Sequence, residues 1–445
     1  MLHTKRGTFA KGNGPLFLFY DKWIDNWIPL VGGRYVAMIR KARKTWKTLF
    51  AIWCLWSGML AGYAVVCQQI PTNMYLYEED AMEVLSGNSK KINPEKLNID
   101  FAGDIHIAQS KNGSYEAMFR FLGMIPVKTM ELEVVQKQEV LPGGIPVGIY
   151  VETDGIFVIG TGDIETEHGS IESPAKNILK TGDYIVSFQG ERISEKRELV
   201  ERLREFQGEE LVLGIRRKQE ELKVSVHPYY EHGVCCIGVW VRDDTQGVGT
   251  LTYLTLDGKF AALGHGISDS DSEILMEVSE GKLYDCEIVG ITKGEKGIPG
   301  RLAGKINYRK NNIFGDVRGN LSGGIYGTAN QSLKSELNNA PMPVGLKQEI
   351  KTGKASIRCS VDGEVEEYEI RITKVNKGEK NINKGMEIKI VDSKLLELTG
   401  GIVQGMSGSP IIQDGKLVGA VTHVLVNDPT RGYGIFIENM LEAAE

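Results

Sequence analysis

The sequence predicts a mainly β protein with one transmembrane helix near its N-terminus. From residue 115 onward, short runs of alternating apolar and polar residues are separated by turns rich in Gly, Asn and Asp, a pattern typical of β-strands. Nearer the N-terminus, residues 48–66 carry no charge, and 19 helical residues just cross a bilayer core of about 30 Å. The 445 residues are too many for one ordinary domain, so we expect two or three.

The charge pattern around the apolar stretch predicts how the chain is oriented. Residues 1–47 hold ten Lys or Arg against two Asp, about +8, which leaves about −14 for the remainder of a chain whose net charge is −6. No charged residue follows the stretch until Glu78. The positive-inside rule therefore makes 1–47 a cytoplasmic basic segment and 48–67 a transmembrane helix or signal anchor, with the rest outside the cytoplasmic membrane. Whether the anchor is cleaved stays open, because 62–64 offer a small-residue cleavage site.

The composition excludes several classes of function. A content of 42% hydrophobic and 25% charged residues is typical of globular protein, and a net charge of −6 gives no reason to expect nucleic-acid binding. The six cysteines are scattered and match no disulfide framework or zinc spacing. We therefore expect no metal and no other cofactor.

The strand pattern divides the exported part into three segments. Residues 68–114 are polar and weakly patterned, and we expect a tether. Residues 115–230 predict a β domain with leading strands and one helix, whose apolar residues Leu199, Leu203 and Phe206 share a face. Residues 231–445 contain short strands and little helix, which is consistent with a double β-barrel.

The first of these domains resembles the PDZ domains of bacterial proteases. The resemblance rests on Ser173-Pro174-Ala175, Gly182-Asp183 and Gly190, followed by the helix and a final strand pair. It implies that a peptide C-terminus adds as a strand, with its carboxylate on backbone N–H groups of the preceding loop. By position, that loop contains Val147, Gly148 and Ile149. The segment 176–179 departs from the family pattern, so a PDZ-like spacer without a peptide ligand is the alternative.

A serine in a glycine-flanked turn gives the strongest chemical signal. Ser407 lies in Gly405-Met406-Ser407-Gly408-Ser409-Pro410, ahead of a predicted hairpin at Asp414-Gly415. The glycines allow a tight turn in which the N–H groups of Gly405 and Ser407 converge on one oxygen, as an oxyanion hole requires. The pattern resembles the nucleophile turn of trypsin-like β-barrel peptidases, except at Met406, where those enzymes often have Asp.

A serine nucleophile requires a base, and two of the seven histidines are candidates. His265 follows an apolar strand and is bracketed by Gly264 and Gly266, which is typical of a side chain presented at a strand end. His423 follows the hairpin strand, where packing beside the serine's own sheet is expected. We therefore favour His265 and keep His423 as the alternative.

Three longer segments resemble the SpoIVB peptidase family of endospore-forming bacteria. They are 249–252, 262–265 and 401–410, supported by 419–430, and the similarity covers roughly residues 115–440. The resemblance implies a His–Asp–Ser triad, in which His265 and Ser407 map directly and the acid maps to Asp392. Asp269 and Asp271 are nearer to His265 in sequence and stay open as alternatives for the acid.

The expected function is that of a membrane-anchored serine endopeptidase. The resemblance implies that it cleaves a membrane regulatory protein, and itself near the N-terminus, as a sporulation signal that activates sigma-K from the space between the forespore membranes. The expected partners are a protein substrate at the membrane and a peptide C-terminus, with no nucleic acid. The alternative is a catalytically inactive, membrane-tethered PDZ adaptor on a peptidase-like fold. Cleavage specificity, natural substrate and oligomeric state do not follow from the sequence.

Overall fold

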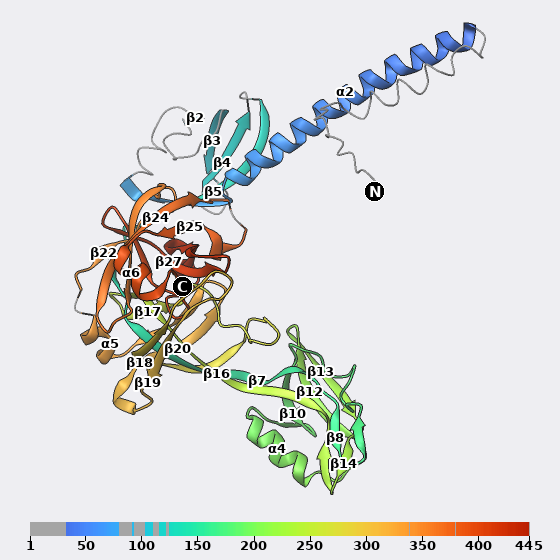
Figure 1. Cartoon of the computed structure of the whole chain (residues 1–445), viewed down its shortest axis with the longest axis vertical. Helices are drawn as coiled ribbons and strands as arrows, with labels where there is room; N and C mark the ends of the chain where they lie inside the picture. Colours follow the sequence, from blue (N-terminus) through green and yellow to red (C-terminus); the bar gives the residue numbers. More distant parts are fainter. Residues whose placement is uncertain are drawn as a thin grey trace, which may run out of the picture. The chain divides into compact units, whose positions relative to one another are not determined.

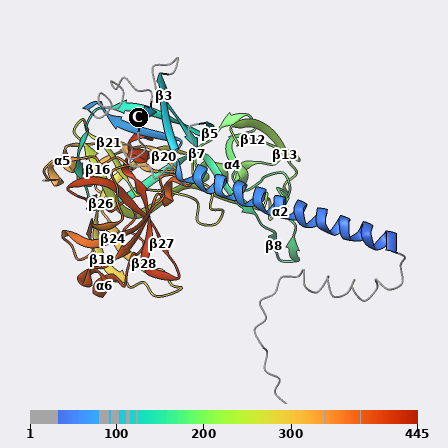
Figure 2. The same cartoon turned by 90° about the horizontal axis from the view of Figure 1, so that it is seen from above.

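The computed structural model describes residues 33–79, 91–92, 103–109, 115–121, 124–337, 339–378 and 380–444. The chain divides into two compact units, Met1–Cys67 and Gln68–Glu445. Helix α2 (Gly33–Gln69) is continuous (Figures 1 and 2). Its segment Thr45–Cys67 has a mean hydropathy of 1.8 and is long and apolar enough to cross a membrane. The expected apolar helix is therefore present. The predicted cytoplasmic segment lies mostly outside the described residues.

A five-stranded sheet follows α2 in sequence, with the strand order β1-β5-β4-β3-β2. Met74 and Leu76 alternate on the buried face of the first strand, which pairs in parallel with β5. The expected tether at 68–114 therefore contains ordered strands, because this alternation buries one face of β1. The strands are β1 (Asn73–Tyr77), β2 (Lys91–Ile92), β3 (Gly103–Gln109), β4 (Tyr115–Phe121) and β5 (Ile125–Val135).

The first barrel is a ring of six strands in the order β7-β18-β20-β21-β17-β16, closed because β16 pairs again with β7. Apolar side chains such as Val147, Leu251 and Phe260 fill its interior. The ring strands are β7 (Pro146–Thr161), β16 (Val239–Thr255), β17 (Lys259–Ala262), β18 (Val278–Thr292), β20 (Ile313–Leu321) and β21 (Gly324–Ala329). Three strands extend it: β6 (Glu139–Pro142), β19 (Arg301–Ile306) and β22 (Met342–Pro343).

Two long strands, β7 and β16, join the first barrel to a separate module (Figure 1). Residues 147–153 of β7 pair with β18 in the barrel, whereas 156–157 pair with β10 in the module. Residues 154–242, which we call the insert, thus lie between two barrel strands. This arrangement differs from the division expected at residues 230 and 231. Alternation identifies a strand but not the sheet in which each half of it pairs.

The insert has its own apolar core, formed by residues such as Ile156, Leu199 and Leu213. Its helix α4 (Lys196–Glu205) buries Leu199 as the sequence predicts. The other insert elements are β8 (Ile164–Thr166), β9 (Gly169–Ile171), β10 (Tyr184–Phe188), β11 (Glu191–Arg192), β12 (Leu211–Arg217), β13 (Glu220–Val226), β14 (Tyr229–Glu231) and β15 (Val234–Cys236).

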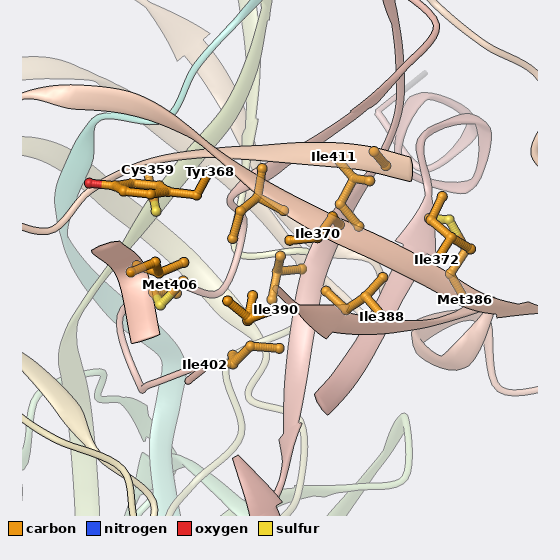
Figure 3. Packing of buried hydrophobic residues seen from close by; sticks show 14 of the residues in the cluster. Cys359, Tyr368, Ile370, Ile372, Met386, Ile388, Ile390, Ile402, Met406 and Ile411 are labelled. Carbon is orange, nitrogen blue, oxygen red and sulfur yellow. The ribbon is translucent and has the colours of Figure 1, made fainter. Parts of the chain in front are cut away.

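The second barrel is closed in the order β23-β24-β25-β28-β27-β26, so the expected double β-barrel is confirmed. Ile370, Ile388, Ile390 and Ile411 point into its core (Figure 3). The strands are β23 (Gly353–Ser360), β24 (Val365–Val375), β25 (Met386–Ile390), β26 (Pro410–Gln413), β27 (Lys416–Leu425) and β28 (Asp428–Phe436). Short helices complete the fold: η3 (Lys310–Asn312), α5 (Gln331–Glu336), η4 (Ile382–Lys384), α6 (Ser393–Thr399) and α7 (Ile437–Glu442).

Candidate active site

A cavity of about 500 Å³ lies where the two barrels meet, and Ser407 and His265 both line it. The first barrel contributes β16 and the segment after β17. The second barrel contributes the turn that carries Ser407 and the end of β27. The structure therefore brings together two residues that are 142 positions apart in the sequence.

The turn around Ser407 depends on glycine backbone conformations. Gly405 and Gly408 have φ angles of 101° and 94°, which L-residues with side chains rarely adopt. A Cβ at Gly408 would lie 2.1 Å from the carbonyl oxygen of Thr250. The turn is thus packed against the first barrel so closely that only glycine fits.

Two threonines of β16 hold this turn. Thr250 Oγ1 donates a hydrogen bond of 2.8 Å to the Gly405 carbonyl oxygen, and the Thr250 N–H donates one of 2.9 Å to the Ser407 carbonyl oxygen. Thr252 Oγ1 donates to the Gly408 carbonyl oxygen at 2.8 Å. The sequence motifs predict no role for these threonines. Their spacing of two residues, which puts both on one face of a strand, is the signal that could have found them.

These hydrogen bonds leave two backbone donors free beside Ser407. The Gln404 carbonyl oxygen accepts from the Leu302 N–H at 2.8 Å, so the Gly405 N–H of the same trans peptide points the opposite way. Within the described part of the chain, neither the Gly405 nor the Ser407 N–H is donated to a protein acceptor. These two unpaired donors lie on either side of Met406, and an oxyanion hole requires two such donors.

Ser407 Oγ donates to the Thr422 carbonyl oxygen at 2.9 Å, and the structure describes no hydrogen bond from it to an imidazole. In unliganded enzymes, catalytic hydrogen bonds often form only with substrate in place. Rotation about one side-chain torsion is the movement that would redirect this hydroxyl.

His265 follows a strained connection at the end of β17. Leu263 has a φ of 72°, unusual for a residue with a branched side chain, and Gly264 has a φ of 68°. His265 Nδ1 lies 2.9 Å from the Gly266 carbonyl oxygen. Because a carbonyl can only accept, Nδ1 must carry the hydrogen, which leaves Nε2 unprotonated in the neutral ring. Burial lowers the pKa of His265, an effect that the Gly266 carbonyl partly offsets, so the ring is neutral at pH 7.

His423 packs against His265, with ring centroids 4.9 Å apart and an interplanar angle of 34°. Desolvation of the ring, with a smaller contribution from His265, lowers the pKa of His423 to about 4. This second imidazole is therefore also neutral at pH 7. It lines the same cavity as Ser407.

The structure does not bring Asp392 to His265. Asp392 is the N-cap of α6, where one carboxylate oxygen accepts from the Leu395 N–H at 3.0 Å. The other accepts from the Glu369 N–H at 3.3 Å. Asp392 is absent from the cavity lining. In place of the implied triad acid, the structure shows a helix cap.

The two other candidate acids are also engaged elsewhere. Asp269 is fully buried and pairs with Arg242 of β16 at 2.6 Å, and it accepts hydrogen bonds from the loop at Asp271 and Ser272. Asp271 is exposed and lies 3.3 Å from the same guanidinium. Among the described residues, no carboxylate is hydrogen-bonded to His265, whose Nδ1 is held by Gly266 instead.

We predict that Asp392→Asn retains catalytic turnover within about threefold of the unmodified chain, because asparagine caps helices nearly as well as aspartate. Asp392→Ala is expected to lower the free energy of unfolding by about 1 kcal/mol, with the folded variant still active. The measurements are thermal unfolding and turnover of both variants. A triad acid would behave differently: its change to asparagine typically lowers kcat by about 10⁴-fold. A loss of that size in Asp392→Asn, without a change in stability, would contradict the capping role.

The predicted peptide-binding residues lie in the first barrel. Val147 and Ile149 are buried in its core, and their strand pairs with β16 on one side and β18 on the other. A Cβ at Gly148 would lie 2.5 Å from Ile306 Cγ2. The expected carboxylate-binding loop is therefore not formed by these residues, because both edges of their strand are already occupied.

Comparisons with known proteins match the second half of the chain to a family. Residues 233–441 match the family model described as SpoIVB peptidase S55. Among the solved structures that match is the PDZ domain of the SdrC-like protein from Listeria monocytogenes. It has 16% sequence identity and a TM-score of 0.16, and the match covers 20% of this chain and 87% of that one. Among curated proteins, none matched the chain.

Proposed function

Because residues 233–441 match the family model described as SpoIVB peptidase S55, we propose that the chain is a serine endopeptidase in which Ser407 is the nucleophile and His265 the base. The observation that supports this most directly is the shared cavity. The Ser407 hydroxyl, the neutral imidazoles of His265 and His423, and two unpaired backbone donors lie in it or at its edge. These are the components that acyl transfer requires.

In the proposed reaction, Ser407 Oγ leaves the Thr422 carbonyl and attacks the scissile carbonyl carbon. His265 Nε2 takes the hydroxyl proton, and the amides of Gly405 and Ser407 hold the oxyanion. The imidazolium then gives this proton to the leaving amine, and a water hydrolyses the acyl-enzyme by the reverse sequence. The Gly266 carbonyl keeps the hydrogen on Nδ1 throughout, which is the orienting role that a carboxylate fills in other peptidases.

The proposed location is the outer side of the cytoplasmic membrane, with one helix as the anchor. The apolar segment Thr45–Cys67 and the basic residues before it support this topology. Resemblance to the family supports the finer proposals: a membrane regulatory protein as substrate, self-cleavage near the N-terminus, and sigma-K activation between the forespore membranes. If the purified, active chain cleaved no membrane protein, this result would contradict these proposals.

We propose the insert as a PDZ-like module that recruits a peptide C-terminus. It also contacts the loop that follows His265: the Glu277 N–H donates to Tyr184 Oη at 2.8 Å, and Arg216 pairs with Glu277 at 3.0 Å. A bound peptide would thus lie on a module that touches the segment carrying the base. Failure of the full chain to bind any member of a library of peptides with free carboxyl ends would contradict recruitment.

A fluorophosphonate probe tests the proposed function. The probe phosphonylates a serine only where a base and an oxyanion hole activate the hydroxyl, so we expect labelling of Ser407 and none in Ser407→Ala. Peptide mapping of the labelled full chain in detergent micelles gives the modified residue. The inactive PDZ adaptor predicts no labelling of the wild type at any pH, an outcome that would refute the peptidase.

A further inference from the structure

The cavity that holds Ser407 is lined without a single formal charge. Its lining contains no Asp, Glu, Lys or Arg among the described residues, and its two imidazoles are neutral at pH 7. Most of the remaining lining side chains are aliphatic. A charged side chain placed here would lose its hydration and find no ionic partner, which is strongly unfavourable.

The position of the oxyanion donors decides which side of the cleft receives which part of a substrate. The oxygen of the scissile carbonyl must lie at the Gly405 and Ser407 amides, so the neighbouring side chain on the acyl side lies against the second barrel. The leaving amine must reach His265 Nε2, which the first barrel carries. The acyl-side wall therefore consists of residues 402–404, which lead into Gly405, and of Val424 and Val426, at and just beyond the end of β27.

Apart from Gln404, the side chains of this wall are aliphatic, and they are firmly held. Ile402 is buried, and its N–H donates to the Pro429 carbonyl oxygen at 2.8 Å. Its Cδ1 lies so close to Gly432 that a Cβ added at Gly432 would be 2.6 Å from it. Val424 packs partly against the core of the second barrel. The Val426 carbonyl oxygen accepts from the Gly297 N–H at 2.8 Å, which fixes the open end of the wall.

We propose that Ile402, Val424 and Val426 form the specificity subsite for the residue on the acyl side of the scissile bond, and that this residue is an uncharged aliphatic one such as valine or leucine. The inference rests on the proposed peptidase function. It deepens that function by naming the class of sequence that is cut: protein segments with an aliphatic residue immediately before the cleaved bond.

Peptidyl diphenyl phosphonates that differ only in the side chain next to phosphorus test the subsite. Ser407 Oγ forms a bond to phosphorus, one P–O(phenyl) bond breaks, and the hydroxyl proton leaves with the phenol. On the full chain in detergent micelles, we expect the valine probe to react on the order of 100-fold faster than the lysine or glutamate probe. The fluorophosphonate, which carries no such side chain, measures the activity of Ser407 separately.

The variant Val426→Asp is designed to change the specificity of the subsite, and Val289→Asp is its control. Val426 is 47% exposed, so a carboxylate is tolerated there, and it should raise the ratio of lysine-probe to valine-probe rates at least tenfold. Val289→Asp, on an exposed valine that does not line the cavity, should leave that ratio unchanged. If Val426→Asp does not fold, Val424→Thr serves in its place, and it should weaken the preference for valine.

The outcomes separate the two proposals. Fluorophosphonate labelling together with equal or faster reaction of the lysine or glutamate probe would overturn the subsite and leave the peptidase intact. An unchanged ratio in folded Val426→Asp would also overturn the subsite. No labelling of Ser407 by any probe would overturn both.

Discussion

Replacing Ser407 by alanine is expected to lower the turnover of peptide cleavage by about 10⁶-fold, because the variant lacks the attacking hydroxyl. The backbone of the turn should persist, since Thr250 and Thr252 bind the carbonyl oxygens of residues 405, 407 and 408 and not the serine side chain. Loss of the single hydrogen bond from Ser407 Oγ to Thr422 is expected to cost about 1 kcal/mol of stability. Turnover of quenched fluorescent peptides and thermal unfolding together measure both effects.

Ser335→Ala is the matched control for this change. Ser335 lies exposed on α5, and its hydroxyl donates only to the Gln331 carbonyl oxygen of the same helix. Its removal should change neither turnover nor labelling. Cleavage at the wild-type rate by a folded Ser407→Ala variant would show that another residue is the nucleophile.

The serine turn could be predicted because its constraint is local. A tight turn with converging N–H groups requires glycine at fixed positions around the nucleophile, and Gly405 and Gly408 have the expected positive φ angles. The hydrogen bonds that fix the turn come from Thr250 and Thr252, more than 150 positions away. Sequence periodicity carries no information about contacts over such a separation.

The long strands could not be predicted for a related reason. An alternating run such as 146–161 indicates a strand, yet nothing in the alternation says that its first half pairs in a barrel and its second half in the insert. Val147 and Ile149 were consequently expected at a peptide groove. They lie instead in the core of the first barrel.

The misplacement of Asp392 in the expected triad could have been avoided with local rules. An aspartate directly before a helical run that ends at a glycine is a typical N-cap, and α6 runs from Ser393 to Thr399 with Gly400 in the left-handed conformation. The orienting partner of His265, in contrast, is a backbone carbonyl. Every residue has one, so residue types alone could not reveal it.

Removing the imidazole of His265 is expected to lower turnover by about 10⁴- to 10⁶-fold, whereas His423→Phe should retain turnover within about tenfold. His265 is the base because its Nδ1–H is fixed by the Gly266 carbonyl and its Nε2 is left free to accept a proton. Phenylalanine at 423 preserves the ring that packs against His265, so this variant separates packing from proton transfer. Loss of turnover in His423→Phe with near-normal turnover in His265→Ala would exchange the roles of the two rings.

The pH dependence of kcat/KM provides a second test of the same assignment, since its acid limb reports the pKa of the base in the free enzyme. Burial lowers the pKa of His265 below its usual 6.5, so the ring stays neutral, and able to accept a proton, as the pH falls below that value. We therefore expect activity to persist below pH 6.5 and then to fall along a limb that His423→Phe leaves in place. His423 is uncharged above its own pKa of about 4 and exerts no charge on His265 in that range. Loss of activity already above pH 6.5, or a limb that shifts in His423→Phe, would contradict His265 as the base.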